Sequence, residues 1–234
     1  MNDRPVMVIT GSSRGIGFYL ANYFLDRGFL VAGFSRRDAE ISHPSYRHFS
    51  VWVSDETGIK KAFKEIRQGY GRLDVLINNA GIAAMNHSLL MPTDSFEAIY
   101  STNVKGVFLC SRESAKLMKK NGFGRIVNFS TVAVPLKLAG EAVYASSKAA
   151  VVSLTQILAK ELAEFGITVN AIGPTPIKTD LIRSVPEEKL AALLELQAIP
   201  RFGEFRDISN VIDFFIRPGS DFVTGQTIYL GGVS

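Results

Sequence analysis

A glycine-rich segment near the N-terminus constrains the fold of this chain more than any other feature. It reads Thr10-Gly11-Ser12-Ser13-Arg14-Gly15-Ile16-Gly17 and joins an apolar run at residues 6–9 to a pattern with Ile16, Leu20 and Phe24 on one helical face. The apolar run is typical of a strand buried on both faces of a parallel sheet. Strand, glycine-rich turn and helix in this order predict a turn whose backbone N–H groups, at the positive end of a helix, approach a negatively charged pyrophosphate.

Apolar runs recur along the chain and alternate with helical patterns. Strands are expected at residues 6–10, 30–34, 48–53, 74–78, 124–130 and 167–172, with a last one near 226–230. Repeated strand–helix units predict an α/β fold with a parallel sheet. One such sheet accommodates the whole chain, so residues 1–234 are interpreted as a single domain. We find no linker, internal repeat or low-complexity tract.

The second expected strand leads into Ser35-Arg36-Arg37. In dinucleotide-binding folds an acidic residue at this place binds the ribose 2′-hydroxyl, whereas arginine suits a 2′-phosphate, because the guanidinium binds two phosphate oxygens at once. No acid ends this strand, and Arg14 adds a second positive charge from the glycine-rich segment. The cofactor is therefore predicted to be NADP(H) and not NAD(H), unless Arg36 and Arg37 are only solvated loop charges.

Tyr144-Ala145-Ser146-Ser147-Lys148 places a phenol and an amine four residues apart. On a helix, residues i and i+4 share one face, so the two groups converge on one point. A free tyrosine has a pKa of about 10, and a neighbouring ammonium lowers it. The pair is thus a candidate proton-transfer device for carbonyl or alcohol chemistry. On its own, the pattern also fits an amphipathic helix with a solvated lysine.

Further motifs appear in order along the chain. They are Asn78-Asn79-Ala80-Gly81, Ser101-Thr102-Asn103-Val104-Lys105-Gly106, the strand from Gly124 to Thr131, and Asn170-Ala171-Ile172-Gly173-Pro174. With the glycine-rich segment and the Tyr144–Lys148 pair, they resemble the short single-domain branch of the short-chain dehydrogenase/reductase family, from Pro5 to Gly232. The resemblance implies a Rossmann-type, doubly wound, mostly parallel sheet of about seven strands with helices on both faces.

The resemblance also implies a set of site residues. Tyr144 would exchange a proton with the substrate oxygen, and Lys148 would lower the Tyr144 pKa and hold the nicotinamide ribose. Asn103 would anchor a water in a proton relay, and a hydroxyl at Thr131 would hydrogen-bond the substrate. The residues that would contact NADP(H) are Gly11, Ser13, Arg14, Gly15, Ile16, Gly17, Ser35, Arg36, Val53, Asn79, Ala80, Gly81, Tyr144, Lys148, Pro174, Ile177 and Thr179. No metal is expected, because the three histidines lack ligand spacing.

Three positions depart from the family pattern. The catalytic hydroxyl is usually a serine, but the matching position holds Thr131, with Ser130 beside it as the fallback. Since side chains alternate along a strand, Ser130 is expected to point to the other face. Trp52 stands where an aspartate often meets the adenine, and it is expected either to pack on that ring or to fill space beneath it. Thr175 replaces the glycine of the usual Pro-Gly.

Residues 178–205 are expected to form a lid over the substrate. Apolar side chains in this segment suggest helical faces: Leu181, Ile182, Leu190, Leu193 and Leu194. They would either suit a substrate with a hydrophobic part or pack only on the core.

The composition indicates which classes of partner and which cellular compartment to expect. The net charge of +4 comes without a basic stripe interleaved with aromatic residues, so nucleic-acid binding is not expected. Cys110 is the single cysteine, which fits a reducing compartment. No signal peptide is expected before the first strand, and no apolar run long enough to span a bilayer. We expect a cytoplasmic protein with no membrane partner.

The resemblance suggests a homotetramer, or a homodimer, built partly from helices at about 103–120 and 145–164. The apolar stripe of the second helix is expected to be exposed unless another copy covers it. The stripe consists of Val151, Leu154, Leu158 and Leu162.

One main functional hypothesis and two alternatives follow. The main one is an NADPH-dependent carbonyl reductase, and 3-oxoacyl-(acyl-carrier-protein) reductases are the most similar family group. Phe165 stands where that group often has an arginine for the carrier protein, and Gly122 or Phe123 stands where another basic residue is expected. A free ketone, a sugar derivative or a pathway intermediate is therefore also a candidate substrate. The alternatives are a non-catalytic NADP(H)-binding sensor or partner subunit, and a nucleotide-sugar epimerase or dehydratase, which the glycine spacing opposes.

Overall fold

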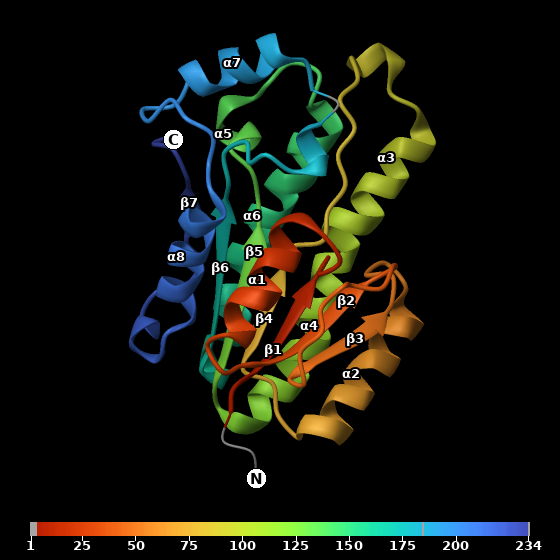
Figure 1. Cartoon of the computed structure of the whole chain (residues 1–234), viewed down its shortest axis with the longest axis vertical. Helices are drawn as coiled ribbons and strands as arrows, with labels where there is room; N and C mark the ends of the chain where they lie inside the picture. The colour runs from red at the N-terminus through yellow and green to blue at the C-terminus, as the bar shows by residue number, and fades with distance from the viewer. Residues whose placement is uncertain (1–3, 184, 234) are drawn as a thin grey trace.

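Seven parallel strands form one central sheet. The computed structural model describes residues 4–183 and 185–233 (Figure 1). The strands are β1 (Val6–Thr10), β2 (Leu30–Ser35), β3 (Tyr46–Ser50), β4 (Val75–Asn78), β5 (Gly124–Phe129), β6 (Ile167–Gly173) and β7 (Thr227–Tyr229). Every expected strand is present, although β3 begins and ends earlier than the range 48–53. The predicted doubly wound parallel sheet is confirmed.

The strand order reverses at the centre of the sheet. The strands lie in the order β3-β2-β1-β4-β5-β6-β7, so after β3 the chain crosses back to begin β4 on the other side of β1. In open α/β sheets, ligands bind outside the carboxyl ends of the strands at such a reversal, because the connections there diverge to opposite faces. The topology therefore directs attention to the ends of β1 and β4.

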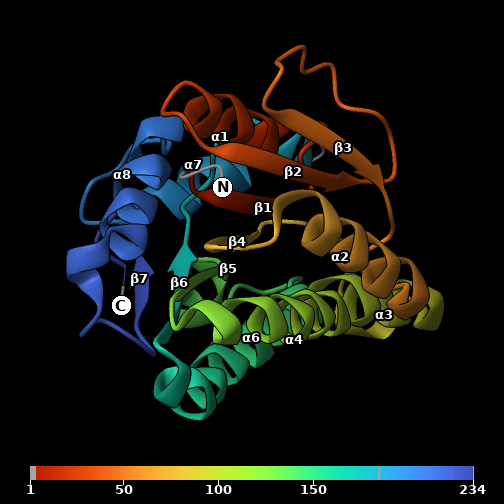
Figure 2. The ribbon, with the colours of Figure 1, turned by 90° about the horizontal axis from the view of Figure 1, so that it is seen from below.

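Helices cover both faces of the sheet (Figure 2). On one face lie α1 (Gly15–Leu25) and α8 (Phe205–Ile216), and on the other lie α2 (Glu56–Tyr70), α4 (Gly106–Met118) and α6 (Ala142–Leu162). Because side chains alternate along a strand, Met7 packs with Phe24 and Phe215 on the first face, while Val8 packs with Leu109 on the second. Each face thus has its own apolar core.

Shorter elements complete the molecule. The helix α3 (Thr93–Tyr100) continues through a π-helical turn, η2 (Ser101–Lys105), into α4, and α5 (Ala133–Leu136) and α7 (Glu187–Glu195) lie beyond the carboxyl ends of the strands (Figure 1). The remaining short turns are η1 (Ser88–Leu90), η3 (Lys119–Asn121), η4 (Ala163–Phe165), η5 (Asp180–Ile182) and η6 (Pro218–Ser220).

The apolar stripe of α6 faces the sheet of its own chain. Val151 and Leu158 are buried in the core, and Leu154 and Leu162 pack against it. The expectation that this stripe would be exposed is therefore wrong, because α6 lies along β5 and β6 with these positions inward. Other apolar side chains on this side of the molecule are exposed instead, namely Phe96 on α3, Phe108 on α4 and Ile157 on α6.

By length and composition alone, one segment of the described chain is long and apolar enough to cross a membrane. It is Ala142–Phe165, which comprises α6 and η4. The expectation that the chain has no such apolar run therefore needs correction. This helix buries Lys148, Val151 and Thr155 inside the fold, so packing on the sheet accounts for its apolar character.

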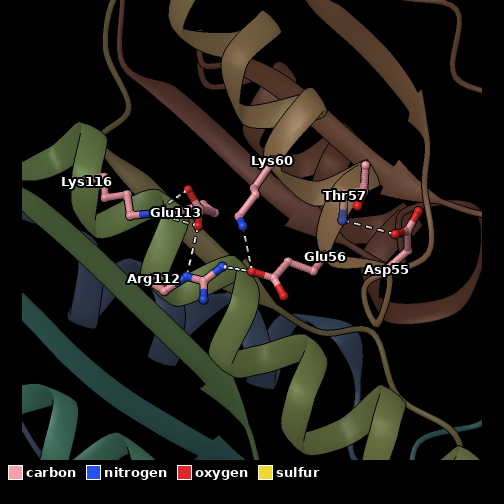
Figure 3. Close-up of polar contacts among 7 residues, drawn as sticks. All are labelled: Asp55, Glu56, Thr57, Lys60, Arg112, Glu113 and Lys116. Atoms are coloured by element: carbon pink, nitrogen blue, oxygen red, sulfur yellow. Dashed lines mark hydrogen bonds and ion pairs between the residues drawn. The ribbon is translucent and has the colours of Figure 1, made fainter.

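Ion pairs connect α2 to α4 on the outer surface (Figure 3). The Glu56 carboxylate accepts from Lys60 at 2.7 Å and from Arg112 at 2.9 Å. Arg112 also donates to Glu113 at 2.9 Å, and Lys116 donates to Glu113 at 2.8 Å. Hydrogen bonds from Lys60 and Arg112 lower the pKa of Glu56 to about 2.

We expect this network to stabilise the fold above acidic pH. Because the pKa of Glu56 is lowered in the folded chain, its contribution is present above pH 4.5 and is lost as the pH falls toward 2. The variant Glu56→Gln should melt at a slightly lower temperature than the wild type at neutral pH, and the difference should disappear in acid and shrink with salt. Thermal unfolding monitored by circular dichroism tests this. The exposed Glu164→Gln is the control, and a difference that persists at the acidic limit would contradict the expectation.

Candidate active site

The glycine-rich segment forms a tight turn between β1 and α1. Gly11 has a φ of +73° and Gly15 a φ of +57°, both in the left-handed region that favours glycine. A Cβ on Gly17 would lie 2.2 Å from the Gly11 carbonyl oxygen, so the first turn of α1 rests directly on the loop. Within the described chain, this helix start has no side-chain cap and no acidic residue. Its N–H groups are therefore available to a bound anion.

Hydrogen bonds join the ends of β1 and β4 where the strand order reverses. The Asn79 amide donates to the Thr10 carbonyl oxygen at 2.9 Å. The Thr10 hydroxyl accepts from the Ala80 N–H, also at 2.9 Å. Asn79 and Ala80 thus lie beside the glycine-rich turn, where a pyrophosphate and its neighbouring ribose would meet them.

The end of β2 presents an exposed arginine next to an exposed indole. The Arg36 guanidinium carbon lies 5.0 Å from the Trp52 ring centroid, and Trp52 is 59% exposed. This exposure leaves the ring of Trp52 available to a planar ligand, either by stacking or by filling space beneath it. Ser35 is buried, and the Val53 side chain lies in the core, so Val53 can meet a cofactor only through its backbone.

Tyr144 and Lys148 lie one turn apart at the start of α6. The Lys148 ammonium donates to the Phe129 carbonyl oxygen at 2.7 Å, and burial lowers its pKa to about 8. Burial and the charge of Glu141 raise the pKa of Tyr144 to about 12, against a smaller lowering by a hydrogen bond with Thr131. The expectation that Lys148 lowers the Tyr144 pKa is therefore wrong for this structure, because the ammonium is engaged by a carbonyl and burial of the phenol dominates.

Asn103 lies in the π-helical turn η2, a distortion that is frequent at functional sites. It is fully buried, its oxygen accepts from the Ile82 N–H at 2.9 Å, and its nitrogen donates to the Ser147 hydroxyl at 3.0 Å. A Cβ on Gly81 would lie 3.3 Å from the Asn103 oxygen and 3.4 Å from the Lys148 nitrogen. The structure therefore brings Asn103, Gly81 and Lys148 together, with Asn103 holding the segment after β4 against α6.

The two hydroxyls that follow β5 have different neighbours. The Thr131 hydroxyl forms a hydrogen bond with the Tyr144 phenol and accepts from the Ala133 N–H at 3.3 Å. Ser130 is buried, and its hydroxyl lies beside the Tyr229 phenol. Both residues line the same cavity, so the predicted alternation does not separate them, but the hydroxyl bonded to the Tyr144 phenol belongs to Thr131.

A cavity of about 420 Å³ opens over these residues. The predicted site residues that line it are Ile16, Asn79, Gly81, Thr131, Tyr144, Lys148, Pro174, Ile177 and Thr179. The predicted residues outside its lining are Gly11, Ser13, Arg14, Gly15, Gly17, Ser35, Arg36, Val53, Ala80 and Asn103. The structure thus divides the predicted residues into a set that lines this cavity, called the chamber, and a set that lies outside its lining.

Part of the segment predicted to form the lid, residues 178–205, lines this cavity. Ile182, Leu190 and Leu193 line the cavity, whereas Leu194 does not. The Leu181 side chain and Ser184 lie outside the described residues. The lid therefore presents an apolar surface to whatever occupies the chamber.

Polar contacts tie the lid to the rest of the site. Asp180 pairs with Arg14 of the glycine-rich turn at 3.3 Å and with Arg183 at 2.7 Å. The Thr175 hydroxyl donates to the Gln197 side-chain oxygen at 2.6 Å, directly after α7. Thr175, the departure from the usual Pro-Gly, thus makes a bond that glycine could not make. The lid rests on the glycine-rich turn at one end and on the end of β6 at the other.

Sequence reasoning missed several residues of this site. Thr10 holds β1 to β4, Tyr46 places its hydroxyl 3.1 Å from that of Ser12, and Glu141 lines the cavity. Only Glu141 had an available signal, since its spacing of three residues from Tyr144 puts both on one helical face. In the described ranges 4–183 and 185–233, no group of three or more histidine, cysteine, aspartate or glutamate side chains is arranged to hold a metal ion.

Comparisons with known proteins agree on one family. The profile of the short chain dehydrogenases matches residues 5–190. The 3-oxoacyl-(acyl-carrier-protein) reductase FabG of Staphylococcus aureus is 35% identical over 235 residues. The alignment spans 96% of this chain and 96% of that protein. Among solved structures, ElxO with NADP bound has a TM-score of 0.89 at 28% identity, with 97% of each chain covered. For 4-hydroxyisoleucine dehydrogenase complexed with NADH, the TM-score is 0.88 at 27% identity, with 99% of each chain covered.

We expect Gly17→Ala to distort the turn and destabilise the protein. The added Cβ would lie 2.2 Å from a backbone oxygen, which cannot move without shifting the loop. Overpacking of this kind costs about 1–3 kcal/mol, and each kcal/mol lowers the melting temperature by roughly 2–4 °C in a chain of this size. Gly219→Ala is the control, because a Cβ there meets nothing within 4 Å. Equal melting temperatures for Gly17→Ala and the wild type would contradict the close contact.

Proposed function

The chain belongs to the short-chain dehydrogenase family, and we propose that it is an NADPH-dependent oxidoreductase that reduces a carbonyl to an alcohol with Tyr144 as proton donor. Family membership and the reductase relatives support an oxidoreductase that uses a nicotinamide cofactor. The observation that carries the finer proposal is the convergence of Thr131, Tyr144 and Lys148 on one cavity beside the glycine-rich turn.

We assign two roles to the residues of the chamber, namely orientation of the substrate and proton transfer. A bound nicotinamide would supply the hydride for the carbonyl carbon. The Thr131 hydroxyl and the Tyr144 phenol, hydrogen-bonded neighbours in the chamber, would both donate to the carbonyl oxygen and hold it in place. As negative charge develops on that oxygen, Tyr144 would transfer its proton, so that the alcohol and a tyrosinate result. Lys148, one helical turn away, would hold the ribose of the nicotinamide, and a proton from solvent would restore the phenol.

The protonation state of Tyr144 supports reduction as the direction at neutral pH. With a pKa of about 12, the phenol keeps its proton at neutral pH and is ready to donate it. Oxidation of an alcohol needs the phenolate as base, and its share grows as the pH rises. The same site would therefore reduce carbonyls near neutrality and oxidise alcohols faster in alkaline solution.

The residues near β2 support NADPH as the preferred form. Arg36 and Arg37 are exposed directly after the strand, where a 2′-phosphate would lie. The glycine-rich turn and the uncapped start of α1 fit the pyrophosphate between that end and the chamber. ElxO is seen with NADP and 4-hydroxyisoleucine dehydrogenase with NADH, so the solved relatives support both forms and the arginines favour NADPH.

The substrate is proposed to be a small carbonyl compound with an apolar part, because the lid lines the chamber with apolar side chains. The FabG relatives support a 3-oxoacyl thioester. Phe165 replaces the expected arginine, but the Lys119 ammonium lies 4.0 Å from the Phe165 ring centroid and puts a positive charge at that place. If the rate with acetoacetyl thioesters is well above the rate with small free ketones, the result would support a carrier-bound substrate.

We also propose a homotetramer or homodimer that works in the cytoplasm. Apolar side chains exposed on α3, α4 and α6, among them Phe108 and Ile157, offer surface for a second copy. Cys110 is a buried free thiol, which suits a reducing compartment.

Tyr144→Phe is expected to abolish turnover and leave cofactor binding intact. Loss of the proton donor should lower kcat by about 10²–10⁴-fold, because a general acid contributes that much. NADPH oxidation with a panel of ketones, quinones and β-ketothioesters is the measurement, and NADPH binding to the variant is the control for folding. Full activity of Tyr144→Phe would contradict the assignment. Tight NADPH binding by the wild type with no turnover on any compound would favour the non-catalytic sensor instead.

Arg36→Ala is expected to weaken NADPH binding and leave NADH binding unchanged. A charged hydrogen bond to phosphate contributes about 1.5–3 kcal/mol, which corresponds to roughly 10–100-fold in Kd. Trp52 is the only tryptophan and lies next to Arg36, so its fluorescence should change when either dinucleotide binds. Arg67→Ala on α2 is the control. Equal losses for NADPH and NADH would show that Arg36 does not bind the 2′-phosphate.

A further inference from the structure

The glycine-rich turn is held from the edge of the sheet by a side chain of β3. The outer strands lie in the order β3-β2-β1, so β2 separates β3 from the turn that follows β1 (Figure 2). The Tyr46 hydroxyl of β3 nevertheless forms a hydrogen bond of 3.1 Å with the Ser12 hydroxyl of the turn. A side chain of the edge strand thus reaches the glycine-rich turn across β2.

Gly33 of β2 leaves the space that this hydrogen bond occupies. A Cβ on Gly33 would lie 2.2 Å from the Tyr46 hydroxyl oxygen and 2.5 Å from the Ser12 hydroxyl oxygen. Any larger residue at this position would therefore push the two hydroxyls apart. The Gly11 N–H also donates to the Phe34 carbonyl oxygen at 2.7 Å, so the turn rests on β2 through its backbone and on β3 through the Ser12 side chain.

The Ser12 hydroxyl depends on Tyr46 for its hydrogen bond. Ser12 is fully buried, and within residues 4–183 and 185–233 the Tyr46 phenol is the one group that its hydroxyl bonds. The Tyr46 hydroxyl also lies 3.4 Å from the His48 Nδ1 atom, so it can donate to one neighbour and accept from the other. Burial raises the pKa of Tyr46, against a smaller lowering by the bond with Ser12, so the phenol keeps the proton that it donates.

Removal of the Tyr46 hydroxyl would change which shape of the turn is stable. In the present shape the Ser12 hydroxyl would be buried without a partner, and an unpaired buried hydroxyl is costly. The turn would escape this cost by exposing Ser12 to water, which would move the neighbouring glycines and the uncapped start of α1. The fraction of molecules in the present shape would then fall, and the apparent affinity for a ligand of that shape would fall by the same factor.

We propose that Tyr46 is a positioning residue for the cofactor, which acts through Ser12 to hold the glycine-rich turn in the shape that binds the pyrophosphate. Because NADPH and NADH share the pyrophosphate, Tyr46 supports the binding of both to the same extent. Arg36, in contrast, is proposed to act on the 2′-phosphate of NADPH alone. This inference rests on the proposed function in one respect, since it assumes that a nicotinamide dinucleotide binds at the glycine-rich turn.

Dinucleotide binding to a set of variants tests this proposal. Titration with NADPH and with NADH, followed by calorimetry well below the melting temperature, gives the two Kd values of each folded variant. In Tyr46→Phe both Kd values should rise by the same factor, roughly 5–100-fold, which is the expected effect of one unpaired buried hydroxyl. Adding Ser12→Ala to Tyr46→Phe should return both Kd values to within about threefold of the wild type, because no hydroxyl is then left unpaired. Tyr70→Phe, a half-buried tyrosine on the opposite face of the sheet, is the matched control.

Three results would overturn the inference and leave the reductase proposal intact. The first is a Tyr46→Phe variant with wild-type Kd values, even if it melts at a lower temperature, because the hydrogen bond would then only stabilise the fold. The second is a loss confined to NADPH, which would assign Tyr46 to the 2′-phosphate. The third is a loss that Ser12→Ala does not repair, since Tyr46 would then act without Ser12.

The same titrations separate this inference from the proposed function. If the wild type binds the dinucleotides but reduces no carbonyl compound, the reductase proposal fails, whereas the expected pattern of Kd values would still support the role of Tyr46. If the wild type binds neither NADPH nor NADH, both the inference and the reductase proposal are overturned. Circular dichroism shows whether each variant is folded.

Discussion

The hydrogen bonds that join Thr10 to Asn79 and Ala80 are the interaction on which the rest of the site depends. They fasten β1 to β4 at the one place where the strand order reverses. The glycine-rich turn follows Thr10 directly, and the segment after Ala80 leads to Gly81, beside which Asn103 and Lys148 lie. A shift between the two strand ends would therefore move the glycine-rich turn relative to the groups of α6. This close approach explains the glycine at position 11, where a Cβ would lie 2.8 Å from the Asn79 side-chain nitrogen.

Burial sets the chemistry of the chamber more than the pairing of neighbouring charges does. It raises the pKa of Tyr144 and lowers that of Lys148, since each charged form is penalised in an apolar environment. The Tyr144 phenol thereby keeps its proton, whereas its hydrogen bond with Thr131 lowers its pKa by a smaller amount. The carboxyl of Glu141 is itself subject to burial, which raises its pKa, while Lys189 lowers it. Three ionisable groups thus share one small apolar volume, and each is sensitive to what enters it.

The lid connects the two ends of the site. Asp180 contacts Arg14 in the glycine-rich turn, and Thr175 bonds to Gln197 after α7. Because the lid also lines the chamber with apolar side chains, a ligand on the glycine-rich turn and a substrate under α7 meet the same segment. Ligands bound at these two places would therefore both contact the lid.

The sequence by itself determined the elements whose physics is local. Apolar runs predicted all seven strands, the glycines predicted the turn before α1, and the spacing of Tyr144 and Lys148 predicted a shared helical face, because periodicity and backbone freedom are properties of neighbouring residues. Only the tertiary structure decided that the α6 stripe faces its own sheet, that Lys148 binds the Phe129 carbonyl, that Trp52 is exposed and that Glu141 is buried without a partner. These features depend on which distant segments cover a side chain, and burial by segments far along the chain leaves no local pattern to read.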